Sequence, residues 1–225
     1  MPIVKISGKI VDFAHVPKCA GTAMEVYLTK AFGTLAFRDT KFNARAPGTR
    51  WTKGSPQHVD ANAISTLFPS EFFDESFAAV RSPVTRLVSA FRFQRDVEAL
   101  IGPDVTLEEW LTRVHRTRNR APWQFDNHTR LMDDIVPQSA RIFRLEDGLD
   151  AVVPWLQDIA GAEYSLPQTI TPHNVTDKRL VFERKAIRPV IPTQNEIALI
   201  HRYYRDDFER FHYHPLTGDP IQHPV

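Results

Sequence analysis

Apolar residues gather in short runs along the chain, and amphipathic stretches separate these runs. One run begins at Ile10 and ends before Pro17, and another covers Phe77 to Val80. Their length, and the turn residues that follow them, are typical of buried strands. The segment from Arg141 to Leu145 predicts a third strand. Strands that alternate with helices favour an α/β fold with a central parallel sheet flanked by helices on both faces.

Several amphipathic stretches repeat their apolar residues at the spacing of an α-helix. Ser82 and Pro83 are suited to begin one of these helices, as N-cap and as first helical residue. Capping boxes, in which a threonine precedes a glutamate by three positions, begin two others at Thr106 and Thr193. The predicted helices cover residues 22–32, 83–91, 107–114, 149–159 and 194–211, and the polar residues 38–57 are expected to form a loop.

The composition is that of an ordinary globular protein. The chain has 225 residues, of which 42% are hydrophobic and 24% charged, enough for one domain with a sizeable core. No change of composition divides the chain, so we expect a single domain over residues 1–225. The formal net charge is +1, which argues against a nucleic-acid binder that works through an overall positive field. A site for an anion must therefore come from local charges, and no metal-binding cluster is indicated.

Cysteine usage and hydropathy bear on the compartment. Cys19 is the only cysteine, which excludes an intrachain disulfide and fits a reducing compartment. No apolar run reaches the length of a membrane span, and residues 1–9 contain no apolar signal core. We therefore expect a cytoplasmic protein without an integral membrane segment. The oligomeric state does not follow from the sequence.

The first candidate site lies where the strand ending at Val16 meets the next helix. The turn from Pro17 to Gly21 leads into a helix N-terminus, where backbone N–H groups and the helix dipole attract an anion. Lys18 supplies a full positive charge, Thr22 supplies a hydroxyl, and Gly21 permits close approach of the backbone. In a Walker A loop the lysine follows the glycine, so this loop is of another kind. The alternative interpretation is an ordinary helix start with a lysine that faces solvent.

The second candidate site begins at Arg81, directly after the strand that ends at Val80. A guanidinium group forms paired charge-assisted hydrogen bonds with phosphate oxygens, and the hydroxyl of Ser89 adds a further donor. Arg86 and Ser89 are three positions apart, so we expect them to share a helix face opposite the apolar one. The structural alternative is an arginine at the end of a sheet and a serine on an exposed helix.

Both segments resemble motifs of the carbohydrate sulfotransferases, in the group that includes the heparan 2-O- and chondroitin enzymes. Residues 15–23, His-Val-Pro-Lys-Cys-Ala-Gly-Thr-Ala, are similar to the family's loop His-Ile-Pro-Lys-Thr-Ala-Gly-Thr-Ser. Residues 80–91 are similar to its motif Val-Arg-Asp/Asn-Pro-x-x-Arg-x-x-Ser-x-Tyr/Phe. Supporting similarity at residues 141–147 and 203–213 extends the resemblance over most of the chain.

The resemblance implies a P-loop NTPase-like sulfotransferase fold and an enzyme that uses 3′-phosphoadenosine 5′-phosphosulfate (PAPS) and releases adenosine 3′,5′-bisphosphate. In the family the first loop binds the 5′-phosphosulfate and the second motif binds the 3′-phosphate. Cys19 and Ala23 depart from the family's threonine and serine, so two hydroxyls are missing. The residues assigned to the nucleotide are Pro17, Lys18, Cys19, Ala20, Gly21, Thr22, Ala23, Arg81 and Ser89, together with Lys178 and Arg179 from a late basic loop.

Sulfuryl transfer moves a group in line between two oxygens, so positioning and charge stabilisation carry most of the catalysis. Lys18 is the candidate that stabilises the bridging oxygen of the leaving group. His58 is the candidate base for the acceptor hydroxyl, because the family often has a histidine at about this place and imidazole titrates near neutral pH. The alternative for His58 is a loop or capping role. Glu25 and His128 are other candidate bases, and His15 is expected to be a structural hydrogen-bonding group.

The resemblance favours a hydroxyl on a glycan or glycolipid as the acceptor, while small metabolites stay open. A basic run contains Arg113, Arg116, Arg118 and Arg120 with His115. Such a run is suited to an anionic glycan, or it is the solvated face of a helix.

Other classes of protein share this architecture. A nucleotide kinase or NTPase needs a lysine after the glycine and a carboxylate for magnesium, and neither is evident. A cysteine phosphatase with Cys19 as nucleophile needs an arginine where Glu25 stands. The non-enzymatic alternative is a catalytically degenerate sulfotransferase fold that binds nucleotide or glycan without turnover.

Overall fold

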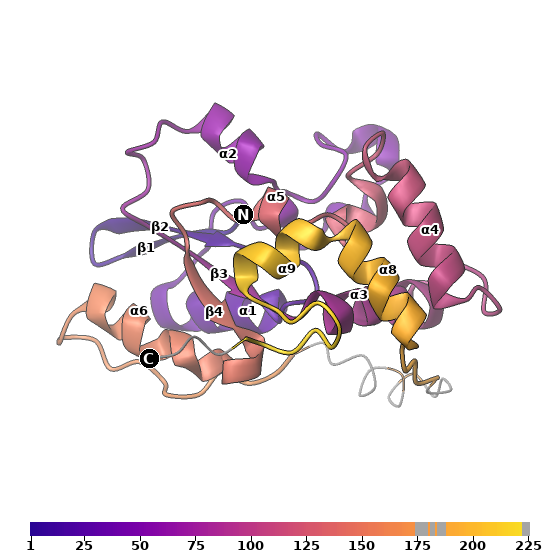
Figure 1. The fold of residues 1–225 in the computed structure, drawn as a ribbon. Helices are drawn as coiled ribbons and strands as arrows, with labels where there is room; N and C mark the ends of the chain where they lie inside the picture. The colour runs from indigo at the N-terminus through magenta and orange to yellow at the C-terminus, as the bar shows by residue number, and fades with distance from the viewer. Residues whose placement is uncertain (174–179, 181–182, 184–187, 222–225) are drawn as a thin grey trace. The chain divides into compact units, whose positions relative to one another are not determined.

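The computed structural model describes residues 1–173, 180, 183 and 188–221 (Figure 1). The chain divides into two compact units, and each unit is assembled from two separate stretches of the sequence. Because the stretches alternate, the chain passes repeatedly from one unit to the other. The single domain expected over residues 1–225 stays a prediction. Unit 1 contains Met1–Val80 and Asp134–His173, and unit 2 contains Arg81–Asp133 and Asn174–Val225.

Unit 1 is built around a four-stranded sheet in the order β1-β2-β3-β4. β1 and β2 form an antiparallel hairpin, whereas β2, β3 and β4 run parallel. Ala14 lies opposite Ala78, so β2 and β3 end at the same edge of the sheet. Ligand-binding loops of α/β proteins arise from this edge. The strands are β1 (Ile3–Ile6), β2 (Lys9–Ala14), β3 (Glu75–Val80) and β4 (Arg141–Arg144).

One face of the sheet is covered by α1 (Gly21–Phe32) and α6 (Val153–Ala160) (Figure 1). Alternate residues of the strands point toward these helices, as the twofold repeat of a strand requires. Phe13 stacks on Phe77 with 4.9 Å between the ring centroids, and Phe77 lies 5.1 Å from Trp155 of α6. These rings form the centre of the core in unit 1.

The opposite face is covered at its hairpin end by α2 (Ala61–Leu67) (Figure 1). Ile64 of this helix packs with Met1 and Ile3. Asp60 caps the helix, because its Oδ1 accepts a hydrogen bond from the backbone N–H of Ala63 at 3.0 Å. Helices therefore lie on both faces of the sheet within unit 1, as the sequence predicts.

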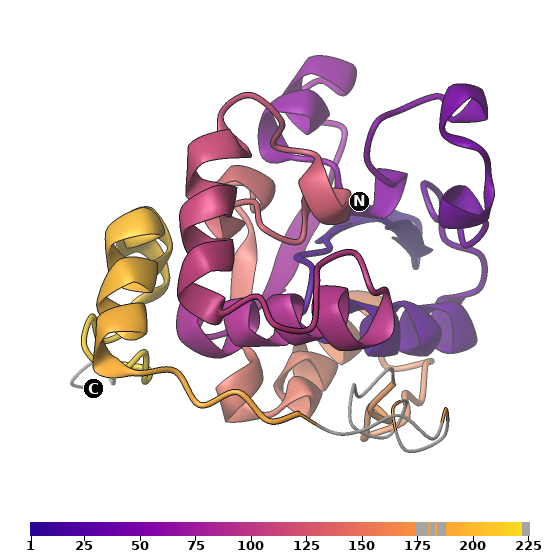
Figure 2. The same ribbon diagram turned by 90° about the vertical axis from the view of Figure 1, so that its right-hand side faces the viewer.

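Unit 2 consists mainly of helices. α4 and α8 lie side by side (Figure 2), where the ring of His115 stacks on that of Tyr203 at 3.9 Å. Arg118 donates to the carbonyl oxygen of Tyr203 at 2.8 Å. The helices are α3 (Pro83–Arg92), α4 (Leu107–Arg118), α8 (Gln194–Tyr203) and α9 (Arg205–Phe211). The short α5 (Met132–Ile135) contains the point in the sequence where unit 2 gives way to unit 1.

Both units also contain short helical turns. They lie at Phe42–Ala44, Pro47–Thr49, Pro56–His58, Phe93–Val97, Gln124–Asn127, Leu145–Asp147 and Leu149–Val152.

A charged pair is buried in unit 2. Asp207 of α9 accepts hydrogen bonds from the backbone N–H groups of Met132 and Asp133, and Nη2 of Arg86 lies 3.7 Å from its Oδ2. Burial raises the pKa of Asp207 to about 6. Arg86 is fully buried and donates to the carbonyl oxygen of His128. Arg86 was expected with Ser89 on the helix face opposite the apolar one, but its side chain is part of the buried interior of unit 2.

The predicted strands and helices are present, but some features differ from the prediction. α2 was not predicted, and the segment expected as a helix over residues 149–159 begins with a 3₁₀ turn at Leu149–Val152 before α6. β1 was not predicted; it pairs with β2 through a tight turn in which Ser7 and Gly8 have positive φ angles of 47° and 89°. The helix expected over residues 194–211 is broken at Tyr204, which separates α8 from α9. Ser82 stands at the N-cap of α3, but its side chain makes no capping hydrogen bond. Among the residues described, no helix combines the length and the apolar character that crossing a membrane requires.

Candidate functional site

The first candidate site is the turn of residues 15–20, which joins β2 to α1 and is called the Lys18 loop below. Lys18 and Ala20 both adopt left-handed backbone conformations, with φ angles of 67° and 60°. This conformation is uncommon for residues other than glycine and costs about 1 kcal/mol or more at each position. Left-handed residues in a tight turn make successive N–H groups converge, and such a concave backbone binds anions.

The helix that follows begins without a capping side chain. Ala20 is its N-cap residue and offers no side-chain oxygen to the first turn. The first intrahelical hydrogen bond runs from the N–H of Met24 to the carbonyl oxygen of Ala20 at 3.2 Å. The start of α1 therefore directs backbone donors and the positive end of the helix dipole toward the Lys18 loop. An anion suits this position.

The side chains of the loop differ in their exposure. Those of Lys18 and Thr22 are half-buried, so an ammonium group and a hydroxyl lie within reach of a ligand. Cys19 is buried, and its backbone N–H donates to the carbonyl oxygen of Val16 at 3.3 Å, which closes the turn. Pro17 and Ala23 are also buried. Cys19 thus shapes the loop, and Lys18 and Thr22 are the polar side chains suited to touch an anion.

Gly21 has a different role from the one that the sequence suggests. A Cβ atom on Gly21 would lie only 1.8 Å from Nε2 of His15. The imidazole of His15 therefore packs directly on the backbone of Gly21, and no larger residue fits. Glycine is required at this position because the His15 ring leaves no room for a side chain. From the sequence, we expected Gly21 to allow a ligand to approach the backbone.

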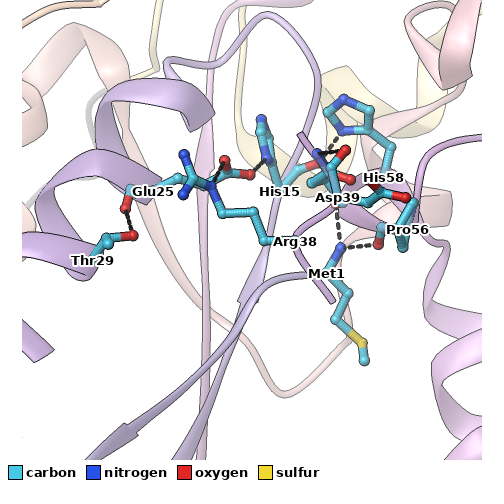
Figure 3. A network of polar contacts seen from close by, with 9 residues as sticks. Met1, His15, Glu25, Thr29, Arg38, Asp39, Pro56 and His58 are labelled. Atoms are coloured by element: carbon cyan, nitrogen blue, oxygen red, sulfur yellow. Dashed lines mark hydrogen bonds and ion pairs between the residues drawn. The ribbon is translucent and has the colours of Figure 1, made fainter. Parts of the chain in front are cut away.

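A network of polar contacts joins the start of the Lys18 loop to the first turns of α1 (Figure 3). His15, at its beginning, hydrogen bonds through Nδ1 with Oε1 of Glu25 at 2.8 Å, and Glu25 lies one turn into α1. The Nε of Arg38 donates to Oε2 of the same carboxylate at 3.0 Å. Burial by itself raises the pKa of Glu25, but the hydrogen bonds and charges of His15 and Arg38 outweigh it and hold that pKa below its usual value. Glu25 is thus an ionised structural group and a poor base, while His15 has the structural role expected of it.

His58 lies beside His15 in unit 1 (Figure 3). Its Nδ1 is 3.1 Å from the carbonyl oxygen of His15, and the two rings meet edge to face at 4.5 Å. A carbonyl oxygen only accepts hydrogen bonds, so Nδ1 must carry the proton. The neutral ring then has its lone pair on Nε2. His58, a buried residue, is therefore held in one tautomer close to the start of the Lys18 loop.

The second candidate site lies in unit 2 and is described by itself. Arg81 directly follows Val80, the last residue of β3, and its Nε donates to Oγ1 of Thr85 in the first turn of α3 at 2.8 Å. This bond uses one of the five N–H donors of the guanidinium group. Ser89 is half-buried on the same helix. Thr85 was not singled out from the sequence, although its spacing of four from Arg81 is the signal for such a contact.

The other predicted residues have varied surroundings. Arg113, Arg116 and Arg120 are exposed, whereas Arg118 is half-buried and packs over the ring of Tyr204. The ring of His128 lies 5.4 Å from that of Phe93. Arg113 and Arg116 line a shallow depression of about 690 Å³ together with Thr106, Glu108, Glu109, Thr112 and Thr117, so its charge is mixed. Lys178 and Arg179 lie outside the described residues.

These features define a class of protein: α/β proteins with a mostly parallel sheet, in which the first parallel strand leads into a tight loop and a helix N-terminus suited to an anion. The comparison with family models narrows the class. The chain belongs to the Sulfotransferase family, whose model matches residues 7–214. No curated protein matches the chain, and no solved structure matches it either. Family membership implies a transferase that moves a sulfuryl group to a hydroxyl-bearing acceptor.

Proposed function

We propose that this protein is a PAPS-dependent sulfotransferase that transfers the sulfuryl group to a hydroxyl of a carbohydrate acceptor and releases adenosine 3′,5′-bisphosphate. The observation that carries the proposal is the Lys18 loop. Two left-handed residues and an uncapped helix start place converging N–H donors beside a lysine and a threonine. This set of donors suits a phosphosulfate, because its anionic oxygens accept hydrogen bonds.

The nucleotide supplies an activated sulfuryl group, and the chain supplies the groups that hold it. Backbone N–H groups of the Lys18 loop and the hydroxyl of Thr22 bind the 5′-phosphosulfate. Arg81 and Ser89 bind the 3′-phosphate, with Thr85 holding the guanidinium of Arg81 at the start of α3. Lys178 and Arg179 remain assigned to the nucleotide by resemblance alone.

Lys18 is proposed as the catalytic cation. Its ammonium group neutralises the negative charge that develops on the bridging oxygen as the bond to sulfur breaks. Its backbone is fixed in a left-handed conformation, so the side chain starts from a defined position in the loop. Preorganised charge is more effective than charge that must move into place.

His58 is proposed as the base that accepts the proton of the acceptor hydroxyl. The carbonyl oxygen of His15 fixes the proton on Nδ1 and thereby places the lone pair on Nε2, the atom that takes the proton. A neutral imidazole in a fixed tautomer is suited to this step near neutral pH. His128 stays the alternative base.

The carbohydrate nature of the acceptor is inferred from the resemblance, and the cytoplasmic location stays a prediction from the sequence. The second candidate function is a degenerate protein that binds the nucleotide without turnover. The observation in its favour is that Cys19 and Ala23 are buried and bring no hydroxyl to the loop. Transfer measured directly separates the two functions.

A labelled-sulfate assay with PAPS and a panel of glycan, glycolipid and small-molecule acceptors tests the proposal. Lys18→Ala should lower kcat by roughly 100-fold, the usual effect of removing one group that stabilises transition-state charge. His58→Ala should lower kcat and should weaken the pH dependence of the rate. Lys30→Ala is the matched control, because Lys30 is exposed in the last turn of α1, the helix that follows the Lys18 loop. Transfer at the wild-type rate by Lys18→Ala contradicts the catalytic assignment.

Thermal shift with adenosine 3′,5′-bisphosphate, compared with ATP, tests the binding step alone. A bisphosphate shift with no transfer to any acceptor supports the degenerate protein. A larger shift with ATP than with the bisphosphate contradicts the nucleotide assignment.

A further inference from the structure

The Lys18 loop holds a strained backbone that needs support. Lys18 and Ala20 are both left-handed without being glycine, and such residues persist only where their surroundings fix them. The short turn that ends with the N–H of Cys19 bonded to the carbonyl oxygen of Val16 closes only part of the loop. The support must come from groups that connect the end of β2 with the start of α1.

His15 and Gly21 make this connection at close range. His15 is the first residue of the loop and Gly21 directly follows its last residue. The imidazole ring packs on the glycine backbone so tightly that a methyl group is excluded. The same ring stacks on Phe13 of β2 at 5.5 Å, which fixes it to the sheet. The orientation of the His15 ring therefore sets the separation of the two ends of the loop.

Glu25 and Arg38 in turn fix the ring of His15 (Figure 3). The carboxylate of Glu25 binds the imidazole with one oxygen and the guanidinium of Arg38 with the other. The side chain of Glu25 is only 6% exposed and that of Arg38 is 27% exposed. A carboxylate this deeply buried requires a cation beside it. Arg38 comes from the segment after α1, so a residue distant from the loop in sequence keeps Glu25 charged and in place.

Building on the proposed function, we propose that Glu25 and Arg38 are positioning residues of the donor site: acting through His15, they hold the Lys18 loop in the conformation that binds the phosphosulfate. Neither residue touches the nucleotide in this proposal.

The test is calorimetric titration of the full chain with adenosine 3′,5′-bisphosphate, together with steady-state kinetics with PAPS. In Arg38→Met the ion pair is lost while most of the aliphatic stem is kept. Losing a buried charge-assisted hydrogen bond costs at least the free energy of a tenfold change in an equilibrium constant. Because the loop loses this support, we expect its affinity for the bisphosphate to fall roughly tenfold. We expect the KM for PAPS to rise by a similar factor while kcat changes by less than about threefold, the pattern of lost ground-state binding.

Two further variants separate positioning from a general structural role. Arg38→Lys keeps a positive charge beside Glu25 and should restore most of the affinity. Arg45→Met is the matched control: Arg45 pairs with Asp39 in the neighbouring segment, is well exposed, and has no contact with Glu25 among the described residues. Its binding should equal that of the wild type.

The outcomes are distinct. Wild-type affinity in Arg38→Met overturns the positioning role, and so does an equal loss in Arg38→Met and Arg38→Lys that follows a fall in the free energy of unfolding. If the wild-type chain itself binds no bisphosphate, the proposed donor fails and the positioning role fails with it. Weak binding in Arg38→Met, recovery in Arg38→Lys and no change in Arg45→Met support the inference.

Discussion

The packing of His15 on Gly21 leads to a quantitative prediction for Gly21→Ala. The new methyl carbon would lie 1.8 Å from Nε2, 1.9 Å from Cδ2 and 2.5 Å from Cε1 of the imidazole. These are atoms of a rigid ring, and the ring is held between Phe13 and Glu25. It must therefore be displaced from its site as a whole.

The magnitude follows from the contacts that the ring loses. Overpacking a filled site costs about 1–3 kcal/mol. The displaced ring also gives up its buried charge-assisted hydrogen bond with Glu25, which contributes about 1.5–3 kcal/mol. We expect the free energy of unfolding of Gly21→Ala to fall by about 3–5 kcal/mol. The bisphosphate affinity should fall with it, since the loop loses its support.

Urea denaturation at neutral pH measures the change, and two variants control it. A Cβ atom on Gly48 meets nothing within 4 Å, so Gly48→Ala should shift the free energy of unfolding by less than about 0.5 kcal/mol. In a His15→Ala background the ring is absent, and there Gly21→Ala should cost less than about 1 kcal/mol. A loss below about 1 kcal/mol for Gly21→Ala in the wild-type background would refute the packing argument.

Two predictions concern buried carboxyl groups. Burial raises the pKa of Asp12 from 3.8 to about 6, so the folded state binds its proton more tightly than the unfolded state and loses stability as the pH rises from about 4 to 6. The free energy of unfolding of Asp12→Asn should therefore rise relative to that of the wild type over this range, by up to about 3 kcal/mol. Urea titrations of both proteins at pH 4 and pH 7 measure this change. If the variant and the wild type differ in stability by the same amount at both pH values, the prediction is contradicted. Asp207→Asn should have the opposite effect and lower the free energy of unfolding by about 3–5 kcal/mol at pH 7, because buried Arg86 loses its counter-charge. Chemical denaturation measures this change. A free energy of unfolding equal to that of the wild type would show that the pair contributes little.

Local patterns in the sequence were sufficient to predict most of the fold. The strands β2, β3 and β4 are short apolar runs, and the capping boxes at Thr106 and Thr193 are both formed in the structure. The Lys18 loop was indicated by the order of strand, turn and helix. β1 was missed because its apolar residues stand only a few positions before those of β2. The pattern therefore did not show two separate strands joined by a turn.

The surroundings of individual side chains depended on contacts between distant parts of the chain. Arg86 was expected on the helix face opposite the apolar one, and nothing near it in sequence indicates that Asp207 forms its buried partner. Arg38 lies in a polar stretch without periodicity, which gave no reason to pair it with Glu25. Lys18 and Ala20 are left-handed although neither is a glycine, so the residue types alone do not reveal their conformations.

The interleaving of the two units bears on how the chain folds as it leaves the ribosome. β4 and α6 complete the sheet and core of unit 1, yet residues 81–133 are synthesised before them. Until Trp155 has emerged, the nascent chain lacks one of the aromatic neighbours of Phe77. Long-range pairing of this kind delays folding and leaves apolar surface exposed during synthesis. Production at low temperature or together with chaperones should therefore raise the yield of native protein.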